Sequence, residues 1–179
     1  IEAHGQAGVL ESAQAIRSEA HRLARLIDNL LLLDRIEATE LTISRAPIDL
    51  NAVIADTVGR LRALDVNREI HLALERQAPP VPADPERIAQ VVTNLVGNAV
   101  RYSPDGAPVT VVTELLPDEV EIRVVDRGIG IPADDLEAIF HRYQRSRSGL
   151  ARGVSGTGLG LSIVREIVQV QCGRVVDTT

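Results

Sequence analysis

The spacing of apolar residues divides the chain into a helical N-terminal stretch and a longer mixed region. Between residues 11 and 37 apolar side chains recur three and four positions apart, with Arg and Glu between them, which predicts a long amphipathic helix. A lone helix of this length has no core of its own. It therefore packs on the domain that follows, or it is half of a helical hairpin that a second chain completes. Residues 38–48 form a short connection that ends at Pro47.

Helical and strand patterns alternate from residue 49 onward. The stretch 49–64 has a helical pattern with Asp49 as its N-cap. Strict alternation over residues 69–74 predicts a half-buried strand. A second helix begins with Asp84 as its cap and Pro85 at the first helical position, and it extends to residue 103.

The second half of the chain contains a predicted hairpin and a final helix. Strands are predicted over residues 108–116 and 119–126, on either side of a turn. A stretch rich in Gly and Arg follows from 127 to 160, and then a helix over 161–171 and a strand over 173–178. This order predicts an α+β fold, a two-layer α/β sandwich with helices on one face of a mixed sheet.

Composition limits the classes of protein to which the chain can belong. Its 179 residues are 45% apolar but include only two Tyr, one Phe and no Trp, so the core must be aliphatic. The net charge of −6 provides no broad basic field, which argues against nucleic-acid binding. Cys172 is the only cysteine, which excludes an internal disulfide and fits a reducing compartment. No apolar run approaches the ~20 residues that a membrane-spanning helix requires.

The absence of lysine excludes several enzyme classes. All 19 basic residues are arginine. A Walker-type phosphate loop needs a lysine at the phosphates, eukaryotic-type protein kinases need a strand lysine, and pyridoxal enzymes need a Schiff-base lysine. The chain belongs to none of these classes unless it is a degenerate copy of one.

The helix that begins at Pro85 carries an unusual polar stripe. Residues at spacings of three and four form one polar face, namely Arg87, Gln90, Asn94, Asn98 and Arg101. The opposite face is predicted to be buried and comprises Ile88, Val92, Leu95 and Ala99. A solvated face usually carries Glu, Arg or Lys, whereas Asn is a mediocre helix former. The two asparagines therefore suggest oxygen ligands for a hard cation or partners for a polar ligand.

A second candidate site lies where the last strand of the hairpin ends. Asp126 is followed by Gly128 and Gly130. A common Asp-x-Gly turn would explain this pattern. Alternatively, the carboxylate accepts hydrogen bonds from an exocyclic amine such as that of adenine, and the glycines let a flat ring approach the backbone.

A third candidate site precedes the final helix. Gly156, Gly158 and Gly160 lead directly into that helix, where exposed amides and the positive helix end can hold phosphate. A dinucleotide-binding loop would follow a strand, and here the preceding stretch is polar. Glycine triplets alone are also compatible with a flexible loop.

In this order, the three sites resemble the ATP-binding catalytic domain of bacterial sensor histidine kinases, within the GHKL superfamily. "NLVGNAVRYS" resembles the asparagine box, "DRGIGIP" and "GTGLGLSIV" the two glycine boxes, and "FHRYQR" the aromatic box that begins the ATP lid. The resemblance covers about residues 48–176 and implies the Bergerat ATP-binding fold. Residues 11–45 are similar to the second helix of the family's dimerisation hairpin and its linker. We therefore expect a partial dimerisation helix and linker over 1–46 and a catalytic domain over 47–179.

The resemblance implies a role for each polar residue of the asparagine box and for one lid residue. Asn98 would coordinate the Mg²⁺ that bridges the ATP phosphates, and Asn94 would support that site. Arg101 would contact phosphate, and Tyr102 would lie against the nucleotide. Arg145 would be a lid arginine near the γ-phosphate.

The glycine boxes are expected to bind the rest of the nucleotide. Asp126 would accept the adenine amine, the glycines beside it would give the ring room, and those of the second box would let the lid hinge. The expected nucleotide-binding residues of the two boxes are Asp126, Gly128, Gly130, Ile131, Gly156, Thr157, Gly158, Leu159 and Gly160.

Asn94 distinguishes between branches of the superfamily. The ATP-hydrolysing members carry a glutamate four residues before the metal-binding asparagine, and it acts as a base for the attacking water. An amide cannot take that proton at neutral pH. Asn94 therefore favours phosphoryl transfer to a histidine over hydrolysis. A GHKL ATPase and a non-catalytic nucleotide-sensing or dimerisation module remain the alternative interpretations.

The phosphoacceptor histidine is not recognisable in this chain. The chain has four histidines, His4, His21, His71 and His141, and none of them lies in the sequence context of the family's acceptor histidine. We therefore expect a fragment of a kinase, shortened at its C-terminal end as well. The expected partners are ATP, the parent's own dimerisation domain, a response-regulator receiver domain and a second copy in a homodimer. A cytoplasmic location is expected, with or without a membrane anchor elsewhere in the parent.

Overall fold

A computed structural model describes residues 12–13, 16, 19–20, 23–24, 26–31, 34, 43–64, 69–151 and 156–176. The chain divides into two compact units, Ile1–Leu41 and Thr42–Thr179. The described residues of the first unit are helical, and most of their large apolar side chains are exposed, whereas Leu26 is half-buried. The rest of the helix predicted over 11–37 lies outside the described residues. No helix in the described part of the chain is long and apolar enough to cross a membrane.

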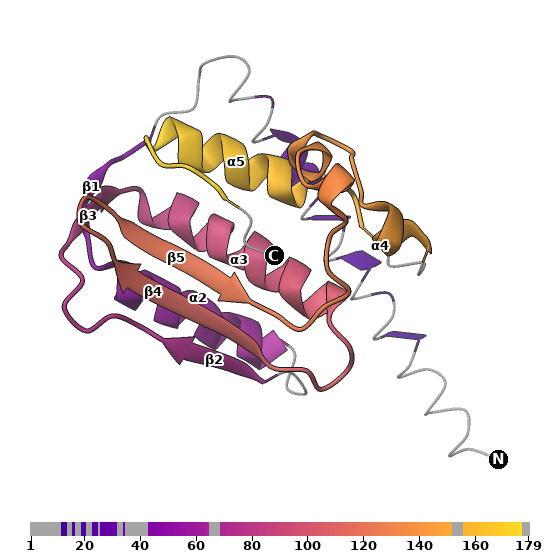
Figure 1. The fold of residues 1–179 in the computed structure, drawn as a ribbon, viewed down its shortest axis with the longest axis horizontal. Coiled ribbons are helices and arrows are strands. Elements are labelled where there is room, and N and C mark those ends of the chain that lie inside the picture. Colours follow the sequence, from indigo (N-terminus) through magenta and orange to yellow (C-terminus); the bar gives the residue numbers. More distant parts are fainter. Residues whose placement is uncertain are drawn as a thin grey trace. The chain divides into compact units, whose positions relative to one another are not determined.

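The second unit is built on a mixed three-stranded sheet (Figure 1). Its strands are β2 (Ile70–Ala73), β4 (Val109–Leu115) and β5 (Val120–Val125), in the order β2-β4-β5. β2 runs parallel to β4, with Leu72 opposite Val111, and β4 pairs antiparallel with β5. The predicted mixed sheet and its hairpin are therefore confirmed.

A smaller sheet was not predicted from the sequence. β1 (Ala46–Ile48) pairs antiparallel with β3 (Val81–Ala83), and Pro47 lies opposite Pro82. Proline within a strand pattern normally argues against a strand, because it cannot donate to the ladder. Since this sheet has only two strands, both are edge strands, where proline is tolerated.

Helices α2 (Leu50–Leu64) and α3 (Pro85–Tyr102) pack on one face of the large sheet, and α5 (Gly160–Val170) packs along α3 (Figure 1). α3 lies between the other two. Both predicted N-caps are confirmed. Asp49 Oδ1 accepts from the Ala52 amide at 3.0 Å. Asp84 Oδ1 accepts from the amides of Glu86 at 3.0 Å and Arg87 at 3.3 Å.

The core between the helices and the sheet is aliphatic, as the composition required. Its buried cluster consists of Leu50, Ile54, Val58, Ile70, Val92, Val96 and Val111. On α3, the predicted inner face is correct at Val92 and Ala99, whereas Ile88 and Leu95 are only half-buried. Val96 is buried instead, because α3 packs against a helix on each side as well as the sheet.

One expectation for the second half of the chain is wrong in part. Residues 173–176 do not form the predicted strand, and the rest of that prediction lies outside the described residues. A turn follows α5, in which the Gly173 amide donates to Val168 O at 2.8 Å and Cys172 has a φ of 64°. Within the described residues of the Gly- and Arg-rich stretch, for which no element was predicted, lie the short helices η1 (Ala133–Asp135), η2 (Ala138–Phe140) and α4 (Arg147–Ala151).

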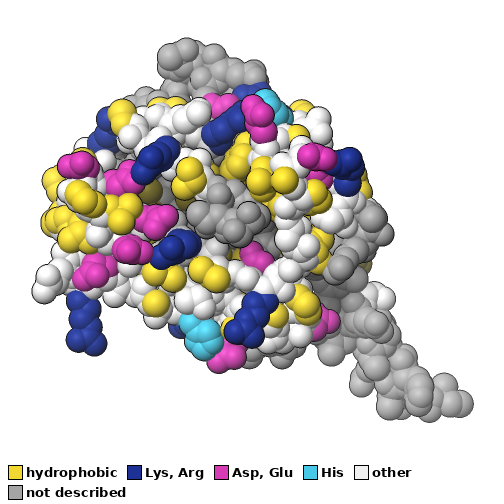
Figure 2. Space-filling model, viewed as in Figure 1, with side chains coloured by type: hydrophobic (Ala, Val, Ile, Leu, Met, Phe, Trp, Pro, Cys, Tyr) yellow, Lys and Arg dark blue, Asp and Glu magenta, His cyan; other side chains and the backbone are white. Residues whose placement is uncertain are grey.

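Acidic and arginine side chains alternate with apolar ones over the face of the molecule drawn in Figure 2. Among the residues coloured on this face, no broad field of one sign is visible. This arrangement agrees with the net charge of −6.

Candidate functional site

The two asparagines of the polar stripe face the first residue of α5. Asn94 and Asn98 are half-buried on α3, and α3 packs along α5. A Cβ atom at Gly160 would lie 3.7 Å from Asn98 Nδ2 and 3.8 Å from Asn94 Oδ1. The fold therefore brings together the asparagine box and the second glycine box, which are more than 50 residues apart in the sequence. Any side chain larger than alanine at Gly160 would fill the space beside both amides.

Asn94 carries a polar atom without a partner. Its Nδ2 is buried and makes no hydrogen bond with the described residues. Leaving a buried donor unsatisfied costs about 1–3 kcal/mol, so a buried amide of this kind calls for an explanation. The amide offers both an acceptor oxygen and a donor nitrogen. Its position beside Asn98 fits a site that is completed by a polar ligand.

The start of α5 adds a positive helix end to the same place. Leu159 occupies the N-cap position and supplies no side-chain hydrogen bond to the first turn of α5. The first amides of a helix lack partners within the helix, and together they carry a partial positive charge. This uncapped end, beside Asn94 and Asn98, can therefore bind an anionic group.

Positive side chains gather around Gly156. The position that a Cβ atom would take at Gly156 lies 3.4 Å from Arg101 Nη1, 3.6 Å from the Tyr102 hydroxyl and 4.0 Å from Arg145 Nε. Two guanidinium groups and a hydroxyl group thus lie close to Gly156, which has no side chain to separate them from its backbone. Guanidinium groups bind phosphate through paired, charge-assisted hydrogen bonds. The donor set therefore fits phosphate, and it comes from the three segments that contain Arg101, Arg145 and Gly156.

Gly158 is required by packing within the protein. It has a φ of 69°, and a Cβ atom there would lie 2.7 Å from the carbonyl carbon of Tyr143 and 2.8 Å from Gln144 O. The Tyr143 amide donates to Gly158 O at 2.9 Å. The second glycine box therefore crosses the end of the aromatic box in direct backbone contact. Of its remaining members, Thr157 is half-buried and Leu159 is buried in the core.

The loop that carries Asp126 folds back on the end of α3. Asp126 is exposed directly after β5, and its Oδ1 accepts from the Gly128 amide at 2.6 Å. The Ile129 amide donates to Tyr102 O at 3.3 Å. A Cβ atom at Gly128 would lie 2.6 Å from Asp126 Oδ1 and 3.0 Å from Tyr102 O. Gly128 is thus needed for this close approach within the protein, which differs from the predicted reason of space for a ring.

The other members of this loop differ in their surroundings. Gly130 is exposed with a φ of 67°, a conformation that suits glycine, and Ile131 is half-buried. The second oxygen of Asp126 retains the acceptor capacity that an exocyclic amine needs.

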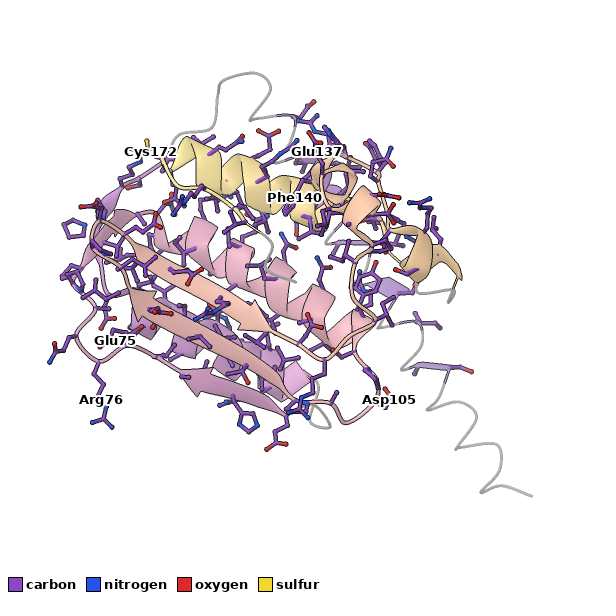
Figure 3. All side chains as sticks on the ribbon, in the orientation of Figure 1. Glu75, Arg76, Asp105, Glu137, Phe140 and Cys172 are labelled. Carbon is purple, nitrogen blue, oxygen red and sulfur yellow. The ribbon has the colours of Figure 1, made fainter. Side chains whose placement is uncertain are left out.

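The aromatic box connects this region to α5. Phe140 lies beside the first turns of α5, at the opposite end of that helix from Cys172 (Figure 3). Arg142 forms an ion pair with Glu166 of α5 at 3.8 Å. These contacts hold the segment that carries Arg145 next to the second glycine box.

Several residues at the site were missed by reasoning from sequence. Gly149 of α4 is buried, and a Cβ atom there would lie 3.0 Å from Tyr102 Cε1. Asp135 of η1 is buried and binds Arg147 at the start of α4. This hydrogen bonding, with the Asp135 charge, raises the pKa of Arg147 above its ordinary value. A five-residue helix has no periodic pattern, so no sequence signal could have indicated these contacts.

Neither of the two histidines that the structure describes joins the site. His71 lies on β2 with its Nε2 atom 3.2 Å from Glu69 Oε1, and His141 is exposed after η2. His4 and His21 lie outside the described residues. The prediction that none of them is the phosphoacceptor stays a prediction.

Comparisons with known proteins agree with this geometry. The family model "Histidine kinase-, DNA gyrase B-, and HSP90-like ATPase" matches residues 83–178, more than half of the chain. The sensor-like histidine kinase SenX3 of Mycolicibacterium smegmatis is 33% identical over 166 residues, which are 91% of this chain and 43% of that protein. The sensor histidine kinase WalK of Bacillus subtilis is 33% identical over 165 residues, 89% of this chain and 26% of that protein.

A solved structure extends the likeness to three dimensions. Full-length ShkA in complex with AMPPNP matches with a TM-score of 0.70 and 26% sequence identity, over 87% of this chain and 32% of that one. The chain spans less than half the length of the curated relatives described above.

The fold and the site together define a mixed α+β nucleotide-binding domain. The chain belongs to the family of histidine kinase-, DNA gyrase B- and HSP90-like ATPases, as a domain homologous to the ATP-binding catalytic domain of sensor histidine kinases. The resemblance inferred from the sequence motifs is therefore confirmed.

Proposed function

We propose that this chain binds Mg²⁺-ATP between α3 and the start of α5 and transfers the γ-phosphoryl group to a histidine of its parent kinase. The observation that carries the proposal is the position of Asn94 and Asn98 beside the uncapped end of α5. The arginines around Gly156 provide the complementary charge for the phosphates. This combination suits a substrate with several negative oxygens and a hard cation.

The residues present fit a magnesium ion held largely by its substrate. Mg²⁺ prefers oxygen ligands, keeps several waters, and usually takes only one or two protein ligands together with substrate phosphates. The Asn98 amide oxygen would be such a ligand, and Asn94 would support it. When bound, the ion would neutralise charge that develops on the phosphates.

Each residue of the site would then have a positioning or charge-neutralising role. Asp126 would accept the adenine amine, and Tyr102 would lie against the nucleotide. Arg101 and Arg145 would bind phosphate oxygens. In the transfer, a histidine nitrogen would form a bond to the γ-phosphorus while the bond to the bridging oxygen breaks, and that electron pair would leave with ADP. Positioning and electrostatics would supply most of the rate, as is usual for phosphoryl transfer.

Asn94 supports transfer to histidine over hydrolysis of ATP. A water molecule attacking phosphorus needs a base to accept its proton. The Asn94 amide cannot act as that base, whereas an unprotonated histidine nitrogen has no proton of its own to lose when it attacks. We therefore expect slow hydrolysis and efficient transfer to an acceptor.

The N-terminal stretch would contribute the dimerisation part. We propose that residues 11–37 form the second helix of a dimerisation hairpin, which follows from the exposed apolar side chains on the helical residues described there. Exposed fractions of 45–71% are found at Ile16, Leu23, Ile27, Leu30 and Leu31. In the parent, this helix would pair with the first helix of the hairpin and form a homodimer. The first helix would present the acceptor histidine, from which an aspartate of a receiver domain would take the phosphoryl group. We place these events in the cytoplasm.

A reconstituted transfer reaction tests this function. The chain is mixed with the parent's dimerisation domain and γ-labelled ATP, and acid-labile label on that domain is measured. We expect label that is lost in Asn98→Ala and when Mg²⁺ is removed. Nucleotide binding without any labelled acceptor would instead support a non-catalytic nucleotide-sensing module. Phosphate release without acceptor would support an ATPase.

A further inference from the structure

The short helix α4 depends on contacts with the rest of the molecule. It has five residues, Arg147–Ala151. Isolated helices shorter than about 12–15 residues are marginal in water. The position of α4 must therefore be set by the side chains that hold it.

Asp135 of η1 holds the first turn of α4. Its carboxylate accepts two hydrogen bonds from Arg147, at 2.8 Å from the backbone amide and 3.1 Å from Nε. The Asp135 residue is only 8% exposed. The first amides of a helix lack partners within it, and Asp135 satisfies the amide of Arg147. Ser146 Oγ satisfies a second one, the Gly149 amide, at 3.2 Å.

Asp134, next in the chain, binds the same arginine in a different environment. Its carboxylate lies 3.3 Å from Arg147 Nη2, but the Asp134 side chain is 86% exposed and receives no bond from the α4 backbone. Exposed ion pairs contribute little to folding stability. Asp134 therefore offers a matched control for Asp135.

The other side of α4 touches two residues of the proposed nucleotide site. Gly149 is buried against the Tyr102 ring, where a Cβ atom would lie 3.0 Å from Cε1 and 3.8 Å from Cδ1. Ser148 Oγ donates to Gly130 O at 3.4 Å. α4 thus supports the Tyr102 ring with its backbone, and Asp135 fixes the end of α4 from which this contact is made.

We propose that Asp135 is a positioning residue for nucleotide binding, which acts by holding α4 so that Gly149 packs on the Tyr102 ring. This inference rests on the proposed function, in which Tyr102 lies against the nucleotide. Asp135 does not itself touch the nucleotide. A ring that is already supported loses less freedom when the ligand binds, and preorganisation of this kind increases affinity.

The first test is calorimetric titration with a non-hydrolysable ATP analogue and Mg²⁺. Asp135→Ala is expected to bind about tenfold more weakly, or ~1.4 kcal/mol. Asp134→Ala is expected to bind like the unsubstituted chain, which we call the parent chain. Asp135→Asn should restore most of the affinity, because its amide oxygen can still accept from the Arg147 backbone amide. Equal affinities for Asp135→Ala and Asp134→Ala would overturn the inference.

Gly149→Ala separates the contact with Tyr102 from the stability of α4. Alanine favours a helix over glycine by about 1 kcal/mol, so a role in helix stability alone predicts unchanged or tighter binding. A methyl group 3.0 Å from Tyr102 Cε1 forces the ring or α4 to shift, so the inference predicts weaker binding. In the double variant that carries Asp135→Ala and Gly149→Ala, the loss of binding free energy should be smaller than the sum of the two single losses, because both substitutions act on the same contact. Unchanged or tighter binding in Gly149→Ala would overturn the inference.

Tyrosine fluorescence tests the contact without any nucleotide. The chain has two tyrosines and no tryptophan, so Tyr143→Phe leaves Tyr102 as the only fluorescent reporter of this kind. In that background, Asp135→Ala should make Tyr102 easier to quench with acrylamide, and Asp134→Ala should not. Unchanged quenching in Asp135→Ala would overturn the inference even if the parent chain binds nucleotide normally. If the parent chain does not bind nucleotide, the proposed function and the inference are both overturned. If it binds normally and Asp135→Ala binds equally well, the inference alone is overturned.

Discussion

Replacing Gly158 with alanine should destabilise the domain by more than the left-handed backbone alone explains. Gly158 has a φ of 69°, and for other residues that conformation costs roughly 1–2 kcal/mol. In addition, the new Cβ atom would lie 2.7 Å from the carbonyl carbon of Tyr143 and 2.8 Å from Gln144 O. Both atoms belong to the backbone, so neither can rotate away. Overpacking of this kind costs about 1–3 kcal/mol, so we expect a total of roughly 2–5 kcal/mol.

Gly106 provides the matched control. It has a φ of 78°, but a Cβ atom there would meet nothing within 4 Å. Gly106→Ala therefore carries the backbone cost without the clash, and the difference between the two variants measures the clash itself. Urea unfolding followed by circular dichroism gives both free energies of unfolding. Equal losses for Gly158→Ala and Gly106→Ala would refute the view that the two boxes meet in backbone contact.

Three further predictions concern stability and chemistry. Asp84→Ala should lower the free energy of unfolding in urea by about 1–2 kcal/mol, because Asp84 caps α3 and also accepts from the Ser44 amide at 3.1 Å. A smaller loss than that of Asp49→Ala, which removes the exposed cap of α2, would contradict this. Asn94→Glu should raise phosphate release from ATP in the absence of acceptor, since it introduces a base, and an unchanged rate would count against the proposed role of Asn94. Arg101→Ala should weaken ATP analogue binding more than adenosine binding in calorimetry, and equal losses would argue against a phosphate contact.

Local signals in the sequence predicted much of the fold. Asp84 followed by Pro85 predicted the start of α3, because capping depends on a few neighbouring residues. The alternating patterns likewise predicted β4 and β5. The pairing of β1 with β3 could not be predicted, since Pro47 and Pro82 argue against strands and the two segments are more than 30 residues apart.

Part of the candidate site could likewise be predicted from the sequence and part could not. The stripe that contains Asn94 and Asn98 was visible because helical periodicity places them on one face, and the structure brings that face to Gly160. The roles of Gly128 and Asp135 were not visible. Gly128 is required by the approach of its own loop to Tyr102, and Asp135 acts on α4, whose position depends on contacts distant in sequence.

The most direct test of the proposed site is calorimetric titration of the parent chain and Asn98→Ala with a non-hydrolysable ATP analogue, with and without Mg²⁺. We expect the parent chain to bind more tightly with Mg²⁺ than without it. Asn98→Ala should lose this dependence on Mg²⁺ while it remains folded by circular dichroism. Binding by the folded Asn98→Ala variant that responds to Mg²⁺ as the parent chain does would contradict the assignment of the site.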